Sequence, residues 1–288
     1  MQPPYPSLTP TWHNDVYPAI EYTNPKVNHN GDVVIVTGAG SGIGCESAVA
    51  FATAGAKQLV LVGRDESKLN STASKLAGVG DAKVSIVVAD VTDEAAVKKV
   101  ADSVENWNVL VHAAGYMNSP APAAAADLDD YWKAYEINVK SIVILAKYLL
   151  PKASPNASVL SMVGGSIVFP TSMLVGLSGY LVSKLALAKT IEFLAAENPD
   201  VFFAAVHPGM VDTDLFRKSG ATPDALAMDT VNLSAGFILW LTLPEVKFLT
   251  GRFVWANWDI DELKGMQEDI TSGAKLTFGY NGFPFPNM

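Results

Sequence analysis

The chain has little of what marks a secreted or membrane-spanning protein. Its 288 residues contain one cysteine, Cys45, so no internal disulfide can form. No apolar run reaches the ~18 residues of a membrane span, and the longest candidate, 233–243, stops at Pro244. The N-terminus lacks a basic segment followed by an apolar one, so no secretory signal is visible. These absences predict a cytoplasmic protein.

Positive charge is scarce as well. Lys and Arg number 20 against 29 Asp and Glu, which gives a formal net charge of −9, and the basic residues are scattered along the chain. Such a surface does not attract nucleic acid or an anionic membrane, so we expect neither as a partner. We also predict no metal site.

The composition predicts one large core. Hydrophobic residues make up 49% of the chain, and no break in composition interrupts residues 31–258. Residues 1–29 are rich in Pro, Asn and Thr without periodicity, which predicts an arm on the surface or on a neighbour. We therefore expect an arm over 1–29, a catalytic domain over 30–258 and a tail over 259–288 that packs on the domain.

Apolar runs suited to buried strands alternate with segments of helical periodicity. The alternation predicts a doubly wound α/β Rossmann fold, with a seven-stranded parallel sheet and helices on both faces. Such a sheet binds its ligand beyond the carboxyl ends of its strands. The predicted strands are 33–37, 58–62, 83–89, 107–111, 157–163, 201–206 and 252–256, and the predicted helices are 43–54, 66–77, 93–104, 128–150, 178–197 and 230–242.

The first predicted strand runs into a glycine-rich turn and then a helix. Glycines permit a tight turn and a close backbone approach, while the unpaired N–H groups of the helix N-terminus attract an anion. This arrangement predicts binding of the pyrophosphate of a dinucleotide. The loop residues expected to contact it are Gly38, Gly40, Ser41, Gly42, Ile43 and Gly44.

Tyr180 and Lys184 are the candidate acid/base pair. One helical turn separates them, so both side chains lie on one helix face. A phenol titrates near pH ~10, and an ammonium beside it favours the phenolate. A Tyr and a Lys at this spacing are common by chance, so their weight comes from the dinucleotide motif upstream.

These motifs together resemble the short-chain dehydrogenase/reductase family, in the long-tailed form of many fungal members. The resemblance covers about residues 30–258 and includes Asp90, the segment 113–115, Asn138 and the segment 208–213. In the family a Tyr is the general acid, a Lys lowers its pKa and holds the nicotinamide ribose, and an Asn holds a water of a proton relay. The resemblance thus implies these roles for Tyr180, Lys184 and Asn138.

The family's catalytic serine has no clear counterpart. Matching from the fifth strand places Gly164 at its position. Ser166, two residues further on, is the candidate substitute, and a true absence is the alternative; Ser161 lies too early, inside the strand. Loss of one oxyanion donor costs on the order of 10²-fold in rate. An absent serine would therefore favour an easier or a different reaction.

The end of the second strand bears on cofactor choice. An NAD site needs a carboxylate there, whereas an NADP site needs a cation for the 2′-phosphate. Gly63 occupies the strand end and Arg64 follows it, which favours NADP(H). In the competing interpretation, Asp65 binds the ribose and Arg64 is merely solvated.

The resemblance assigns the remaining cofactor contacts. Asp90 and Val91 are expected beside the adenine, although Asp90 could instead cap a helix. His112 stands where the family has an Asn that ties neighbouring strands, so we expect a structural hydrogen bond from it. The other expected contacts are Ala114 and Gly115 after the fourth strand, and Pro208, Gly209, Val211 and Thr213 over the nicotinamide.

Apolar residues indicate the partners. The segment after residue 208 has the weak periodicity of a substrate lid and carries the apolar residues Met210, Leu215 and Phe216. We expect these side chains to contact an apolar small-molecule substrate; in the alternative interpretation they pack only on the core of the protein. The segments 131–150 and 180–194 are apolar beyond one stripe. We expect that excess in a homodimer or homotetramer interface, with packing under the tail as the alternative.

The sequence thus predicts an NADP(H)-dependent oxidoreductase of the ketoreductase type. It would transfer hydride between nicotinamide and a carbonyl/alcohol or C=N group of an apolar small molecule, with secondary metabolism as the expected setting. The first rival is an isomerase, dehydratase or cyclase on the same fold, which a missing serine would favour. The second is a non-catalytic NADP-binding regulator, against which the retained Tyr180, Lys184 and Asn138 argue.

Overall fold

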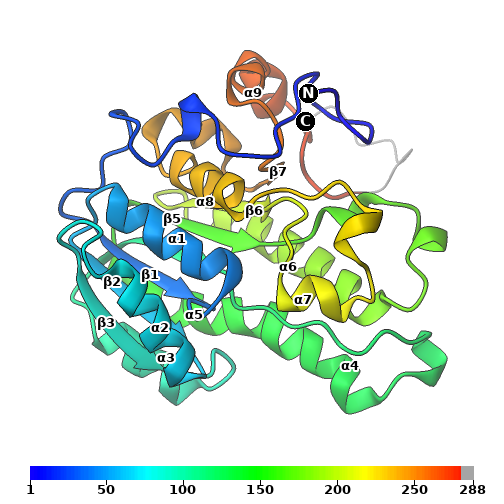
Figure 1. Ribbon diagram of the computed structural model, residues 1–288, viewed down its shortest axis with the longest axis horizontal. Coiled ribbons are helices and arrows are strands. Elements are labelled where there is room, and N and C mark those ends of the chain that lie inside the picture. The colour runs from blue at the N-terminus through cyan, green and yellow to red at the C-terminus, as the bar shows by residue number, and fades with distance from the viewer. Residues whose placement is uncertain (280–288) are drawn as a thin grey trace.

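The computed structural model describes residues 1–279, which form one seven-stranded sheet with helices on both faces (Figure 1). The strand order is β3-β2-β1-β4-β5-β6-β7, and every neighbouring pair is parallel. This confirms the predicted fold class. The strands are β1 Val33–Thr37, β2 Gln58–Gly63, β3 Lys83–Val88, β4 Trp107–His112, β5 Ala153–Met162, β6 Phe202–His207 and β7 Arg252–Trp255.

The helices follow the strands in alternation. Within residues 1–279, no helix is both long and apolar enough to cross a membrane. The α-helices are α1 Gly42–Thr53, α2 Glu66–Leu76, α3 Glu94–Asp102, α4 Leu128–Tyr135, α5 Ser141–Leu149, α6 Ser178–Glu197, α7 Asp214–Lys218, α8 Val231–Trp240, α9 Ile260–Gly265 and α10 Gln267–Thr271. Short 3₁₀ turns are η1 Pro18–Ile20, η2 Ala123–Ala125, η4 Leu150–Lys152, η5 Gly165–Val168, η6 Thr171–Met173, η7 Pro223–Ala225 and η8 Pro244–Leu249.

One predicted helix differs from the structure. The single helix expected over 128–150 consists of α4 and α5 joined by a π-helical turn, η3 Glu136–Lys140. The Ser141 N–H bonds the Glu136 carbonyl five residues back. A one-residue change in hydrogen-bond spacing leaves the apolar pattern nearly intact, so periodicity does not reveal it. Such turns are frequent at functional sites.

The helices begin where side chains cap them. Asp65 accepts the Lys68 N–H at the start of α2, and Asp93 accepts the N–H groups of Ala95 and Ala96 at the start of α3. Thr230 caps α8 by accepting the Leu233 N–H. Each acceptor satisfies a helix N–H that has no partner inside the helix. The caps thus fix the points at which the chain leaves the carboxyl edge of the sheet.

The strand order switches direction between β1 and β4, because β1 has β2 on one side and β4 on the other. In parallel α/β sheets, ligands bind beyond the carboxyl ends of the strands at such a switch point. The Gly-rich loop follows β1 and the segment 113–115 follows β4, so both motifs lie at this point.

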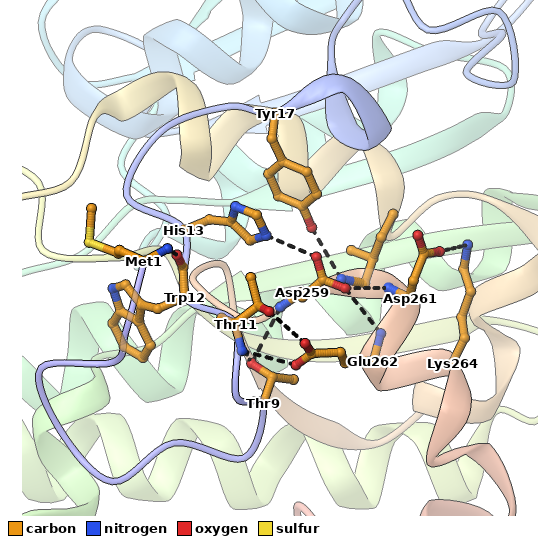
Figure 2. A network of polar contacts seen from close by, with 11 residues as sticks. Met1, Thr9, Thr11, Trp12, His13, Tyr17, Asp259, Asp261, Glu262 and Lys264 are labelled. Carbon is orange, nitrogen blue, oxygen red and sulfur yellow. Dashed lines mark hydrogen bonds and ion pairs between the residues drawn. The ribbon is translucent and has the colours of Figure 1, made fainter.

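The N-terminal arm lies on the segment after β7 (Figure 2). Thr11 donates its N–H and hydroxyl to the Glu262 carboxylate, at 3.1 and 2.6 Å. The Ile260 N–H donates to the Tyr17 hydroxyl at 3.1 Å, and the Met1 ammonium donates to the Trp12 carbonyl at 2.9 Å. The arm is thus fixed onto α9.

The C-terminal tail packs on the sheet edge as far as the structure describes it. The Phe253 N–H donates to the Leu276 carbonyl at 2.8 Å, and Arg252 donates to the Ile270 carbonyl at 2.9 Å. Residues 280–288 of the predicted tail lie outside the described residues. Hydrogen bonds cross the predicted borders at 29/30 and 258/259, and those borders stay a prediction.

Candidate active site and cofactor site

The loop after β1 is shaped by close backbone contacts. Gly38 has φ of +67°, and a Cβ there would lie 2.7 Å from the Ala114 nitrogen. At Gly44 a Cβ would lie 2.4 Å from the Gly38 carbonyl oxygen. Any side chain would separate the turn from β4 or from α1, so both positions need glycine.

The loop leaves a helix N-terminus open to a ligand. Ser41 precedes α1 and makes no capping hydrogen bond through its side chain. A Cβ at Gly42 would lie 3.1 Å from Cγ2 of Thr213, so the loop after β6 reaches across this helix start. Glycines, open N–H groups and a covering loop suit the pyrophosphate of a dinucleotide.

Arg64 and Asp90 face each other across the ends of β2 and β3. Arg64 Nη1 lies 3.8 Å from Asp90 Oδ2, and 60% of the Arg64 side chain is exposed. Asp65 caps α2 and also accepts the Ser67 hydroxyl at 2.6 Å. Asp93 rather than Asp90 caps α3, while Asp90 accepts two hydrogen bonds from Thr92.

Tyr180 and Lys184 lie together inside α6. Lys184 Nζ donates to the Met162 carbonyl at 2.7 Å and lies 5.9 Å from the centroid of the Tyr180 ring. Burial lowers the pKa of Lys184 to about 7 and raises the pKa of Tyr180 above its ordinary value. Burial therefore favours a neutral phenol, the form that can donate a proton.

Asn138 lies in the π-helical turn, and its side chain forms hydrogen bonds that hold two neighbouring segments in place. Its Oδ1 accepts the Tyr116 N–H at 2.8 Å, and its Nδ2 donates to the Tyr116 carbonyl and to the Ser183 hydroxyl, both at 2.8 Å. Ser183 in turn donates to the Tyr180 carbonyl at 2.6 Å. Asn138 thus ties the loop after β4 to the turn of α6 that carries Tyr180.

Gly115 marks the point where these groups meet. A Cβ at Gly115 would lie 3.3 Å from Lys184 Nζ and 3.5 Å from Asn138 Oδ1. The third neighbour, Cδ1 of Leu215 from α7, would lie 3.8 Å away. The predicted Lys and Asn are therefore brought together, under a side chain of the predicted lid.

Gly164 faces the Tyr180 hydroxyl. A Cβ at Gly164 would lie 3.5 Å from that hydroxyl, so a serine here would stand beside the phenol. Ser166 lies in the 3₁₀ turn η5, half-buried, on the wall of a small cavity; Tyr180 is not among the described residues that line it. Ser161 is buried in β5. This placement favours a true absence of the family's serine.

His112 forms the structural hydrogen bonds expected of it. Its Nδ1 lies 3.2 Å from the Ser161 hydroxyl and its Nε2 lies 3.0 Å from the Ser141 hydroxyl. Ser141 already donates to the Ile137 carbonyl, so it accepts from Nε2–H, and Ser161 donates to Nδ1. Burial lowers the pKa of His112 to about 3, so the ring stays neutral and ties β4 to β5 and α5.

His207 at the end of β6 and Asp229, shortly before α8, belong to no sequence motif. His207 Nδ1 accepts the Gly165 N–H at 3.0 Å, and Asp229 Oδ2 accepts the Met210 N–H at 2.6 Å. Gly209 has φ of +94°, and a Cβ there would lie 2.8 Å from the Asp229 carboxylate. Only the position of His207 directly before Pro208-Gly209 gave a signal that it borders the site.

The predicted cofactor residues follow the ends of five strands along one edge of the sheet. They run from β3 through β2, β1 and β4 to β6: Asp90 and Val91, then Arg64, then Gly38, Gly40, Ser41, Gly42, Ile43 and Gly44, then Ala114 and Gly115, then Pro208, Gly209, Val211 and Thr213. Fold and site together define a dinucleotide-binding α/β protein.

Comparison with known proteins gives the family. A profile of the short chain dehydrogenase family matches residues 32–224. The short chain dehydrogenase citE of Monascus ruber is 35% identical over 289 residues, covering 94% of this chain and 97% of citE. The short chain dehydrogenase andI of Emericella variicolor is 33% identical, covering 92% and 93%. The chain belongs to the short chain dehydrogenase family.

Solved structures share the fold. A short chain dehydrogenase from Shigella flexneri 2a, complexed with NADP, superposes with a TM-score of 0.73 at 22% identity, covering 80% of this chain and 99% of its own. A short chain dehydrogenase from Pseudomonas syringae gives 0.74 at 22% identity, covering 86% and 100%. The arm before residue 32 lies outside the family profile.

Proposed function

We propose that the protein is an NADP(H)-dependent reductase of the ketoreductase type, acting on the carbonyl or C=N group of an apolar small molecule, with secondary metabolism as its setting. The observation that supports this most is the meeting of Lys184 and Asn138 beside Gly115, with the Tyr180 ring 5.9 Å from Lys184 Nζ. A bound nicotinamide supplies the hydride. Tyr180 donates a proton to the substrate oxygen, Lys184 stabilises the resulting phenolate, and Asn138 anchors the relay that returns the proton.

Three features at the end of β2 support NADP over NAD as the cofactor. Arg64 is exposed and only loosely paired with Asp90, so its guanidinium is free to bind a 2′-phosphate. Asp65, the rival ribose ligand, is held in place at the start of α2, where its Oδ1 accepts both the Lys68 N–H and the Ser67 hydroxyl. Gly63 leaves the strand end without a carboxylate.

Apolar side chains around the site support an apolar substrate. Leu215 of α7 reaches the space beside Gly115, while Phe216 is buried, so the lid is shared between the site and its own core. The segment between β5 and α6 exposes Val168, Met173 and Val175. Exposure of these apolar side chains to water is unfavourable, and contact with an apolar ligand would bury them.

Gly164 keeps the non-redox rival open. A site with one oxyanion donor fewer suits an isomerase, dehydratase or cyclase as well as an easy reduction. A steady-state assay decides: the reductase oxidises NADPH in step with loss of a ketone or imine. Substrate conversion without net NADPH oxidation would establish the rival instead.

The apolar face of α4, α5 and α6 supports a homodimer, with a homotetramer as the larger alternative. Trp132 is 59% exposed and Phe193 is 60% exposed, and Val143 and Val182 lie exposed on the same helices. Part of the tail does reach α6, where the Phe278 N–H donates to Glu192. Sedimentation of the protein and of Trp132→Glu tests the interface. The cytoplasmic location stays a prediction, which cell fractionation tests.

A further inference from the structure

The lid between β6 and α8, residues 211–228, begins and ends at one point. The Asp229 N–H donates to the Met210 carbonyl at 2.8 Å, and the Met210 N–H donates back to Asp229 Oδ2 at 2.6 Å. We call this pair of residues the neck of the lid. Just before it, the Ser234 hydroxyl of α8 donates to the Pro208 carbonyl. The neck therefore fixes where the lid leaves the sheet and where it returns.

The first part of the lid covers the candidate active site. A Cβ at Gly42 in the cofactor loop would lie 3.1 Å from Cγ2 of Thr213. A Cβ at Gly115, beside Lys184, would lie 3.8 Å from Cδ1 of Leu215. The position of the lid therefore affects both the cofactor loop and the reacting groups.

Polar contacts between the lid and the facing segments are long and exposed. Lys68 Nζ of α2 lies 3.7 Å from Asp214 Oδ2, and Lys218 Nζ lies 4.2 Å from the centroid of the Tyr116 ring. All three charged side chains are exposed, and water screens exposed contacts of this kind, so they contribute little. The neck is thus the stronger polar anchor of the lid.

The N-terminal arm holds the outer side of the neck. The Thr230 N–H donates to the Asn14 carbonyl at 2.9 Å, and the Thr230 hydroxyl donates to Asp15 Oδ1. The same hydroxyl accepts the Leu233 N–H and so caps α8. Thr230 therefore joins the arm, the returning end of the lid and α8.

The arm also meets the neck from a second side. Pro4, Tyr5 and Trp12 of the arm line a small cavity that Met210 and Asp229 line as well. Two stretches of the arm thus lie against the neck, one through side chains around this cavity and one through the hydrogen bonds to Thr230.

The arm is fixed to the rest of the molecule before and after Asp15. Before it, Thr11 donates two hydrogen bonds to Glu262 of the segment α9 (Figure 2). After it, Ile20 is fully buried, and a Cβ at Gly236 of α8 would lie 2.5 Å from the Ile20 carbonyl oxygen. Because both sides are held, the arm can support the neck.

Building on the proposed reductase, in which the lid covers the nicotinamide, we infer that the N-terminal arm is a working part of the active site and that Asp15 is a positioning residue for the lid. Asp15 holds Thr230, and Thr230 holds the neck. Loss of this contact loosens the lid and weakens binding of the cofactor beneath it. The arm precedes the segment 32–224 that the family profile matches, so the profile does not include this support.

Amide hydrogen exchange of the full chain, measured in peptides from the lid, tests the inference. Asp15→Ala removes the acceptor but leaves the α8 cap intact, so we expect lid amides to exchange about tenfold faster while β1 and β4 are unchanged. Affinity for NADPH should fall several-fold. Asp15→Asn keeps an acceptor oxygen and should stay within about twofold of the parent. Glu21→Ala removes the same charge from another exposed position of the arm and is the matched control.

The outcomes separate the inference from the proposed function. Faster exchange confined to the lid, restored in Asp15→Asn and accompanied by weaker NADPH binding, supports the inference. Unchanged lid exchange in Asp15→Ala overturns it, and so does faster exchange throughout the chain or an equal effect of Asp15→Asn or Glu21→Ala. Faster lid exchange with unchanged NADPH affinity refutes a role in the site. A parent protein that binds neither NADPH nor NADH rejects the reductase, and lid exchange alone then decides the role of Asp15.

Discussion

The glycines at the two ends of the site are there for different reasons. Around the cofactor loop, Gly38 and Gly44 leave no room for a Cβ, which would meet backbone atoms at 2.7 and 2.4 Å. At the chemical end, Gly164 has φ of −127°, and a Cβ there would meet the Tyr180 side chain at ordinary distances, 3.5 Å from the hydroxyl and 3.9 Å from Cε1. The backbone therefore requires glycine in the cofactor loop but not at Gly164. The fold therefore leaves room for a serine at this position, as far as the backbone is concerned.

The largest effect on turnover is expected at the end of the site that carries Tyr180. Tyr180→Phe removes the transferable proton and keeps the ring, so we expect turnover to fall by ~10²-fold or more while cofactor affinity stays nearly unchanged. Steady-state kinetics and a fluorescence titration with NADPH measure the two. Turnover within a few-fold of the parent would mean that another group is the acid, or that the reaction is not a reduction.

At the cofactor end, we expect a substitution to change the affinity for the cofactor. Arg64→Leu should weaken NADPH by about tenfold or more and change NADH little, because only NADPH carries the phosphate that the guanidinium would hold. Titration with both cofactors measures the difference. Lys98→Leu is the control, since Lys98 pairs with Asp102 on the exposed face of α3. Equal losses for both cofactors would reject the 2′-phosphate role of Arg64.

The sequence predicted the framework of both ends better than their details. Alternation of apolar runs and helical periods sufficed for the seven strands, because a parallel sheet buried on both faces needs that pattern. The family motifs predicted that Lys184 and Asn138 belong to one site, and the two side chains lie close together beside Gly115. The π-helical turn around Asn138 escaped detection because it changes the hydrogen bonding and hardly the pattern.

Contacts between distant segments were beyond reach of the sequence. His207 and Asp229 act through backbone N–H groups of Gly165 and Met210, and such bonds leave no trace in residue spacing. Tyr5 lines a small cavity with His207 and Trp255, and Thr11 pairs with Glu262, 251 residues away. Only the folded chain shows that the arm packs against the residues that follow β5 and β6.

The two ends should also be coupled through protons. Lys184 has a pKa of about 7 because burial disfavours its ammonium. The negative charges of a bound dinucleotide favour the ammonium and raise that pKa, so binding at about pH 8.5 should take up close to one proton. At about pH 6 the lysine is already charged, and uptake should vanish. Calorimetry in buffers of different ionisation enthalpy measures the uptake, and Lys184→Met should abolish it. Uptake that persists in this variant would assign the proton to another group.

The smallest effect should come from the residue nearest the missing serine. Ser166 lies on the wall of a small cavity with His207 and Trp255, and Tyr180 is not among the described residues that line it. Ser166→Ala should therefore change kcat for a plain ketone by less than about twofold. An oxyanion donor would cost ~10²-fold. Gly164→Ser places a hydroxyl beside Tyr180 without backbone strain and should raise kcat for the same ketone several-fold. A large loss in Ser166→Ala would give Ser166 the serine's role after all. A loss in Gly164→Ser as well would show that the site is shaped to exclude a second donor, which would favour the non-redox reaction.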